Sequence, residues 1–178
     1  MNQPLQPEEL RELRTNLGND VLSLSQEQPV LLIFLRQLGC MFCREAMTQL
    51  GKLRPSLEAN GTQLVFIHMG PAEVAEKLFK KYKLNGCEHV TDPDSYYYAR
   101  FGLTKCNISQ LFGLTAWAKT MEYGLIKGHE YVLPIGDGFQ MPGLFMLQNG
   151  LIIAEFRHTA VYDQPDYAEF VACCATSK

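Results

Sequence analysis

The order of apolar segments in this chain predicts an α/β fold with a central mixed β-sheet flanked by helices. Two apolar segments that suit buried strands are each followed by a helical pattern, and this order implies a parallel pair of strands. Further along, two apolar strands are separated by only Asn149-Gly150, a dipeptide typical of a tight hairpin turn. We expect both hairpin strands to join the same sheet, with a last helix closing the fold.

Size and composition predict one globular domain over residues 1–178. The chain is 47% hydrophobic and 20% charged, and its net charge of −3 gives no basic surface for nucleic acid. No apolar run approaches the roughly 20 residues that a membrane span needs. The N-terminus has neither the basic start nor the apolar stretch of a secretory signal, so a cytoplasmic location is the expectation.

Residues 1–28 are predicted to form an N-terminal helical extension. Pro7 opens a helix with two acidic residues in its first turn. Apolar Leu10, Leu13 and Leu17 follow at helical spacing, and the pattern ends at Gly18.

The next elements alternate between strand and helix. Val30–Leu35 is an unbroken apolar run that suits a central strand, and residues 44–58 have apolar side chains at helical spacing. Pro55 is expected to kink or break that helix. Gln63–Met69 is predicted to be a second buried strand, and Pro71–Tyr82 a second helix.

The remaining segments are an insertion, a hairpin and a helix. Residues 84–134 have weak periodicity, and Tyr96–Tyr98 and Phe101 are placed on a short helix after Asp92-Pro93. We favour core and edge packing for these aromatic residues over a role in a substrate groove. The hairpin strands are residues 144–148 and 151–156, and residues 165–174 form the closing helix, whose predicted inner face carries Tyr167, Phe170, Val171 and Cys174.

Two of the six cysteines lie where the first predicted strand ends and the next helix begins, in Cys40-Met41-Phe42-Cys43. A helix N-terminus carries unpaired N–H groups and a partial positive charge, which stabilise a thiolate. A thiolate is the form that attacks a disulfide or a peroxide. Because the chain has enough apolar residues to fold without disulfide staples, one working cysteine pair in a reducing compartment fits it best.

The element order is that of the thioredoxin fold, and the chain resembles the peroxiredoxin-like branch of that superfamily, of the alkyl hydroperoxide reductase and thiol-specific antioxidant type. The resemblance rests on Phe34-Leu35-Arg36-Gln37-Leu38-Gly39-Cys40-Met41-Phe42-Cys43-Arg44-Glu45 and on Gln140-Met141-Pro142-Gly143-Leu144-Phe145, and it covers most of residues 30–171. It implies a thioredoxin fold with a peroxiredoxin-type insertion and an oxidoreductase activity.

The chain departs from ordinary peroxiredoxins at three of four active-site positions. Cys43 falls on the peroxidatic cysteine, but Cys40 replaces a threonine, Arg36 replaces a proline, and Pro142 stands where an arginine would be. These changes bring the site closer to thioredoxin, in which the first cysteine attacks and the second resolves. A proline before the hairpin strand, which is cis in thioredoxins, points the same way.

The main hypothesis is therefore a thiol–disulfide redox protein in which Cys40 attacks and Cys43 resolves the mixed disulfide. The alternative is a thiol peroxidase with reversed roles, in which Cys43 becomes a sulfenic acid and Cys40 condenses with it. Reduction of quinones or prostaglandin endoperoxides, as in other members of this branch, stays open. A third hypothesis is a non-catalytic binding domain that keeps the fold.

The resemblance also suggests supporting residues and partners. Met141 and Pro142 would bind the substrate, with the Met141 backbone facing a substrate chain. Arg36 and Arg44 are candidates for electrostatic support of the cysteines, as Arg157 is, although solvated charges are the more common outcome. The expected partners are a thiol reductant such as thioredoxin or glutathione and a disulfide or peroxide substrate, without a cofactor, and a homodimer is left open.

Several other residues have competing interpretations. The cysteine pair could be half of a zinc site completed by Cys87 and His89 or by Cys106, which the lack of a second C-x-x-C disfavours. The cysteines outside the pair, including Cys173-Cys174, are expected to be structural or incidental. No role is assigned to Glu45, His68 or His158, although His158 is the one whose hairpin position could face the site.

Overall fold

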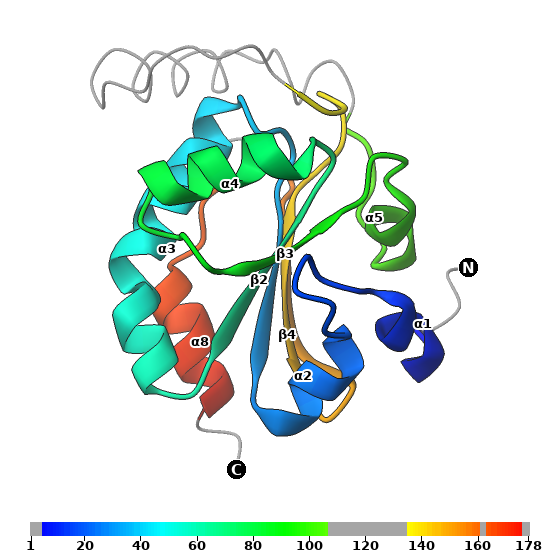
Figure 1. The fold of residues 1–178 in the computed structure, drawn as a ribbon, viewed down its shortest axis with the longest axis vertical. Coiled ribbons are helices and arrows are strands. Elements are labelled where there is room, and N and C mark those ends of the chain that lie inside the picture. The colour runs from blue at the N-terminus through cyan, green and yellow to red at the C-terminus, as the bar shows by residue number, and fades with distance from the viewer. Residues whose placement is uncertain (1–4, 107–134, 161–162, 176–178) are drawn as a thin grey trace.

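The computed structural model describes residues 5–106, 135–160 and 163–175. Figure 1 shows a twisted sheet between two groups of helices. The five described strands run in the spatial order β3-β2-β1-β4-β5. Their bounds are β1 Val30–Phe34, β2 Gln63–His68, β3 Glu88–Thr91, β4 Gly143–Gln148 and β5 Leu151–Arg157.

The sheet is mixed, as the sequence predicts. Strand β2 runs parallel to both β1 and β3, whereas β4 is antiparallel to both β1 and β5. The central strand β1 is buried along its whole length, which explains its unbroken apolar sequence. In the tight turn between β4 and β5, Asn149 and Gly150 both have positive φ, at 52° and 76°, as the predicted hairpin requires.

Strand β3 was not predicted, because its sequence does not look like a buried strand. Glu88 and His89 are both buried, which only the tertiary structure explains. The Glu88 carboxylate accepts hydrogen bonds from Thr15, Asn19 and Gln63. Because these partners come from distant segments, the local pattern carries no sign of them.

One face of the sheet is covered by α3 (Met41–Ala59), α4 (Ala72–Lys81) and α8 (Tyr167–Ala175) (Figure 1). Helix α3 begins three residues before the predicted start and continues through Pro55, so the expected break does not occur. At Gly51 the helix passes so close to the end of α4 that an added Cβ would lie 1.9 Å from the Tyr82 carbonyl oxygen. The close packing of these helices therefore requires glycine at this position.

The other face is covered by α1 (Pro7–Glu12), α2 (Val21–Glu27) and α5 (Tyr96–Arg100) (Figure 1). The predicted helix from Pro7 to Gly18 was too long: α1 ends at Glu12, and Leu17 is 63% exposed. Helix α2 was missed, although Asp20 caps it by accepting a hydrogen bond from the Ser23 N–H at 2.9 Å. Both helices bury leucines against the sheet, so the N-terminal extension contributes side chains to the core.

The short helix predicted around Tyr96–Tyr98 is present as α5, and its central tyrosine is a packing residue. Tyr98 is fully buried, and its hydroxyl donates to the carbonyl oxygens of Leu35 at 2.5 Å and Ile67 at 3.1 Å. It thereby joins the ends of β1 and β2. Most of the predicted insertion, residues 107–134, lies outside the described residues. Across the part of the chain that is described, no helix is long and apolar enough to cross a membrane.

Candidate active site at the start of helix α3

The two cysteines occupy different positions at the start of α3. Cys40 is the N-cap residue, with an extended backbone (φ −67°, ψ 131°), and it is partly exposed. Cys43 lies in the first turn and is buried, with 5% of its surface exposed. Both thiols are free in this structure. The strand-to-helix placement predicted from the sequence is confirmed, and it brings both sulfurs to the positive end of a 19-residue helix.

The pair is electrostatically asymmetric. A hydrogen bond from the Cys43 thiol is the largest effect that lowers the pKa of Cys40, to about 6, with help from the Arg36 charge and from the backbone N–H groups of Cys43 and Phe42. The same hydrogen bond, burial and the Cys40 charge raise the pKa of Cys43 well above its ordinary value. Cys40 is therefore a thiolate at neutral pH, and Cys43 is a thiol.

The arginines are not the solvated charges that were expected. Arg36 and Arg44 are both buried, at 8% and 1% exposure, and Arg36 lines the pocket beside the cysteines. The Arg36 Nε finds no hydrogen-bond partner among the described residues. Arg157, in contrast, is engaged elsewhere: it donates to the Phe101 carbonyl at 3.2 Å and its guanidinium lies over the Phe145 ring. Of the three candidates, Arg36 is the one whose charge is among the causes that lower the pKa of Cys40.

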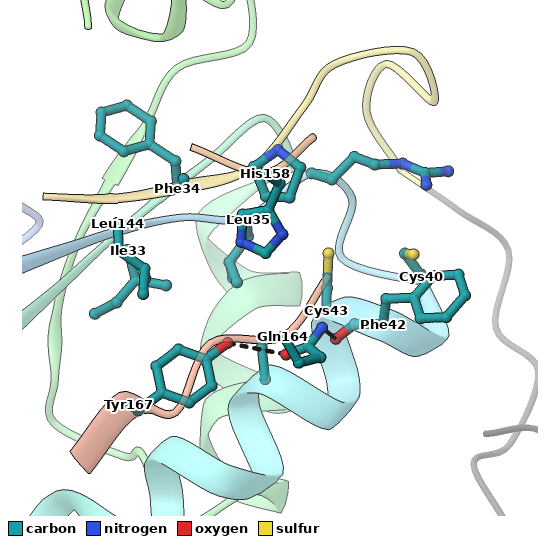
Figure 2. Close-up of a pocket in the computed structure, with 14 residues that line it drawn as sticks. Ile33, Phe34, Leu35, Cys40, Phe42, Cys43, Leu144, His158, Gln164 and Tyr167 are labelled. Carbon is teal, nitrogen blue, oxygen red and sulfur yellow. Dashed lines mark hydrogen bonds between the residues drawn. The ribbon is translucent and has the colours of Figure 1, made fainter. Parts of the chain in front are cut away.

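A small pocket opens beside the cysteines (Figure 2). Its free volume of about 20 Å³ is close to the space of one water molecule. One wall of the pocket includes His158, Gln164 and Tyr167. The Tyr167 hydroxyl donates to the Gln164 Oε1 at 3.0 Å, and the Gln164 Nε2 donates to the Phe42 carbonyl at 3.3 Å. This chain of hydrogen bonds ties the start of α8 to the first turn of α3.

The sequence assigned no role to these three wall residues, although it placed two of them well. Tyr167 was on the predicted inner face of the closing helix, and His158 was the histidine whose hairpin position could face the site. Gln164 carried no signal, because it precedes the helix in an irregular segment. The structure brings all three to the pocket.

Pro142 lines the pocket, but this loop differs from the thioredoxin pattern in two respects. Every peptide bond between described residues is trans, so Pro142 is not a cis proline. The Met141 backbone was expected to face a substrate, but its N–H donates to the Thr104 carbonyl at 3.0 Å. The Met141 side chain is buried in a cluster with Phe42 and Cys106. Met141 is therefore engaged inside the protein.

The other candidate residues lie apart from the pair. Burial raises the pKa of Cys87 to about 11, which keeps it protonated. His68 and His89 share a hydrogen bond of 2.9 Å between β2 and β3. Within the described ranges, no three His, Cys, Asp or Glu side chains are grouped so that they could hold a metal ion. The side chain of Cys174, which was predicted to face inward, is not among the described side chains.

A thioredoxin-type mixed sheet with a thiol pair at the first turn of the following helix defines a thioredoxin-fold thiol oxidoreductase. The family model for AhpC/TSA antioxidant enzymes matches residues 49–160, so the chain belongs to this family. The matched range begins after Cys43 and includes His158.

Curated relatives with the name prostamide/prostaglandin F synthase are similar to this chain. The zebrafish (Danio rerio) protein is 27% identical over 173 residues, which cover 95% of this chain and 85% of that protein. The salmon (Salmo salar) protein is 41% identical over 80 residues, which cover 41% of this chain. That second alignment spans only 39% of the salmon protein.

Solved structures share the fold at low sequence identity. A structure of Xanthomonas campestris peroxiredoxin Q has a TM-score of 0.66 and 16% identity, with 98% of both chains covered. A secreted Mycobacterium tuberculosis disulfide oxidoreductase homologous to E. coli DsbE has a TM-score of 0.57 and 18% identity, with 93% of this chain and 98% of that chain covered. These similarities establish the thioredoxin fold.

Proposed function

We propose that this protein is a thiol–disulfide oxidoreductase in which Cys40 attacks the substrate and Cys43 resolves the intermediate. The observation that carries the proposal is the asymmetry of the pair. Cys40 is partly exposed and its pKa is lowered to about 6, whereas Cys43 is buried and its pKa is raised. An attacking thiol has to be ionised and accessible, and a resolving thiol has to be close to it.

The reaction needs two exchanges between sulfurs. The Cys40 thiolate attacks one sulfur of a substrate disulfide, forms a mixed disulfide and expels the other sulfur as a thiolate. Cys43 then loses its proton and attacks the Cys40 Sγ, which expels the second substrate sulfur. Two electrons pass from the protein to the substrate, and the Cys40–Cys43 disulfide remains for a thiol reductant such as thioredoxin or glutathione to reopen.

The order of these two steps follows from the interactions that raise the pKa of Cys43. Two of its three main causes are the hydrogen bond to Cys40 and the Cys40 negative charge. Both disappear once Cys40 is bound to a substrate sulfur, so the pKa of Cys43 falls at that moment. Cys43 is thus held back until there is an intermediate to resolve.

A second candidate function is reduction of an oxygen–oxygen bond, again with Cys40 as the attacking thiol. Membership of the AhpC/TSA antioxidant enzyme family supports a peroxide substrate, and the similarity of 95% of this chain to a zebrafish protein named prostamide/prostaglandin F synthase supports a lipid of the prostaglandin type. The Cys40 thiolate would attack one oxygen and release the other as an alkoxide, and Cys43 would then displace the sulfur-bound oxygen. Attack by Cys43, which the peroxiredoxin alignment suggests, has less support because this thiol is buried and protonated.

Single-turnover oxidation of the reduced protein tests both candidates. The oxidants are glutathione disulfide, hydrogen peroxide and an alkyl hydroperoxide, each followed by acid quench and mass spectrometry of alkylated peptides. The proposal predicts a Cys40–Cys43 disulfide with glutathione disulfide, and a trapped glutathione on Cys40 in the Cys43→Ser variant. Faster oxidation by the hydroperoxide than by glutathione disulfide would favour the second candidate. A trapped adduct on Cys43 in the Cys40→Ser variant, at the wild-type rate, would overturn both.

A further inference from the structure

His158 is a half-buried titratable side chain that the two sulfur exchanges above do not use. It directly follows β5 and points into the pocket toward Cys43 (Figure 2). Its ring packs edge-on against Phe156, with centroids 5.0 Å apart, and its backbone N–H donates to the Pro142 carbonyl at 3.4 Å. These contacts fix the position of the ring in the pocket that Cys40 and Cys43 also line.

The hydrogen bonds of the ring define its tautomer. One ring nitrogen bonds to the backbone of Asp163, and this bond favours the protonated ring, so the partner is the carbonyl oxygen. The Nδ1 atom is buried and finds no partner in the described ranges, so the nitrogen that donates to Asp163 is Nε2. With its proton on Nε2, the neutral ring has a free lone pair on Nδ1.

We infer that the Nδ1 atom of His158 accepts the proton of the Cys43 thiol when Cys43 attacks the mixed disulfide on Cys40. This inference rests on the proposed function, because it assigns a residue to its second step. As the Cys43 sulfur bonds to the Cys40 Sγ, its proton passes to Nδ1, and the substrate sulfur leaves as a thiolate. The imidazolium then gives the proton to that thiolate, so a thiol departs and the ring is neutral again.

The surroundings of the ring suit this role. Burial lowers the pKa of His158 to about 4, so the ring is neutral and able to accept a proton at physiological pH. Negative charge that develops on Cys43 stabilises the imidazolium, as the nearby Asp163 carboxylate does. The other titratable or charged groups of the pocket are Arg36, Cys40 and Tyr167. The free space holds about one water molecule, so any water-mediated path for the proton is short.

Stopped-flow reaction with DTNB separates the two exchanges. The protein is used with Cys173→Ser and Cys174→Ser, which removes the exposed Cys173 thiol and its neighbour in the sequence, while Cys87 and Cys106 are buried. Attack by Cys40 releases a first coloured thiolate, and attack by Cys43 on the mixed disulfide releases a second. In His158→Gln we expect an unchanged first phase and a second phase slowed by about tenfold to a hundredfold near neutral pH. The slowed phase should accelerate with rising pH, because hydroxide then removes the proton, while the second phase of the parent protein stays flat between about pH 6 and 8.

Two further variants make the test specific. In His158→Ala, added imidazole should restore the second phase, since it can occupy the vacated space. His68→Gln alters a buried histidine outside the pocket and should leave both phases unchanged. A second phase in His158→Gln with the rate and the flat pH profile of the parent would overturn the role of His158. A parent protein that releases no second thiolate would instead contradict the proposed function itself.

Discussion

Two pairs of neighbouring titratable side chains in the described residues, Cys40 with Cys43 and His68 with His89, differ in their surroundings. Cys40 and Cys43 follow β1, whereas His68 is the last residue of β2 and His89 lies within the neighbouring β3. Each pair shares a hydrogen bond, and in each pair burial acts on the pKa values. A hydrogen-bonded pair inside a protein is therefore not reactive in itself.

The difference lies in charge and access. The cysteine pair has the Arg36 guanidinium, a helix N-terminus and a pocket, and its two pKa values move in opposite directions. The histidine pair is almost fully buried, and both of its pKa values are lowered, so both rings are neutral near pH 7. Two pKa values that move in opposite directions beside a pocket indicate a reactive pair. Two pKa values that are both lowered in a closed core indicate a structural pair.

The largest effect is expected from removing the attacking sulfur. Cys40→Ser should reduce the transfer of electrons to glutathione disulfide to the background rate, because Cys40 is partly exposed and its pKa is lowered to about 6. Cys43→Ser should keep the first exchange and stop after it. The measurement is the single-turnover rate with mass analysis. Cys87→Ser is the matched control, because that thiol is buried and stays protonated, and loss of activity in it would contradict the comparison.

The histidine pair should make the free energy of unfolding depend on pH. Burial and the neighbouring His89 lower the pKa of His68 from 6.5 to about 4 in the folded state. His68 therefore binds a proton more readily in the unfolded chain than in the folded protein. The stability that neutral His68 contributes is lost as the pH falls from about 6.5 to 4. At 1.36 kcal/mol per unit the loss is about 3 kcal/mol.

Chemical denaturation at pH 7, 5.5 and 4 measures this dependence. His68→Gln should have a smaller decrease in the free energy of unfolding over this range than the parent. If the variant and the parent have the same slope, His68 is not the group that titrates. Its cysteine reactivity should not change, since His68 does not line the pocket.

Arg36 should account for part of the asymmetry of the cysteine pair. Arg36→Met removes the charge but keeps an apolar stem of similar length, and it should raise the pKa of Cys40 by about one unit. The readout is the pH midpoint of Cys40 alkylation by iodoacetamide. Arg36→Lys is the control and should retain most of the lowered pKa. An unchanged midpoint in Arg36→Met would assign the whole shift to Cys43 and the helix N-terminus.

The smallest effect is expected at the residue that links the two regions. Tyr98→Phe removes the hydroxyl that donates to Leu35 and Ile67, at the ends of β1 and β2. Leaving two buried carbonyls without this donor should lower the free energy of unfolding by about 1 to 2 kcal/mol. Thermal or chemical denaturation measures it. A shift in the Cys40 pKa without a loss of stability would show that the hydroxyl acts on the site instead.

The parts of the fold that the sequence predicted are those with strong local patterns. Strands β1, β2, β4 and β5 and helices α3 and α4 have apolar periodicity or turn residues of their own. Strand β3 and helix α2 were missed, because the partners of Glu88 and the buried face of α2 come from elsewhere in the chain. Of the two outcomes expected at Pro55, a kink or a break, the break does not occur, because α3 continues through this residue.

The candidate site likewise has a part that the local sequence predicted and a part that depends on tertiary packing. The placement of Cys40 and Cys43 followed from a short motif between a strand and a helix. The wall formed by His158, Gln164 and Tyr167 depends on how the hairpin and α8 pack against α3, which no local pattern contains. The burial of Arg36 and the engaged backbone of Met141 are likewise tertiary effects.

The most direct test of the account is the pH dependence of alkylation of the reduced protein by iodoacetamide, resolved for each cysteine by mass spectrometry. The account predicts that Cys40 is modified first, with a midpoint near the pKa of about 6, and that Cys43 stays unmodified at neutral pH. Modification of Cys43 before Cys40, or a Cys40 midpoint near the ordinary value of 9.0, would contradict it.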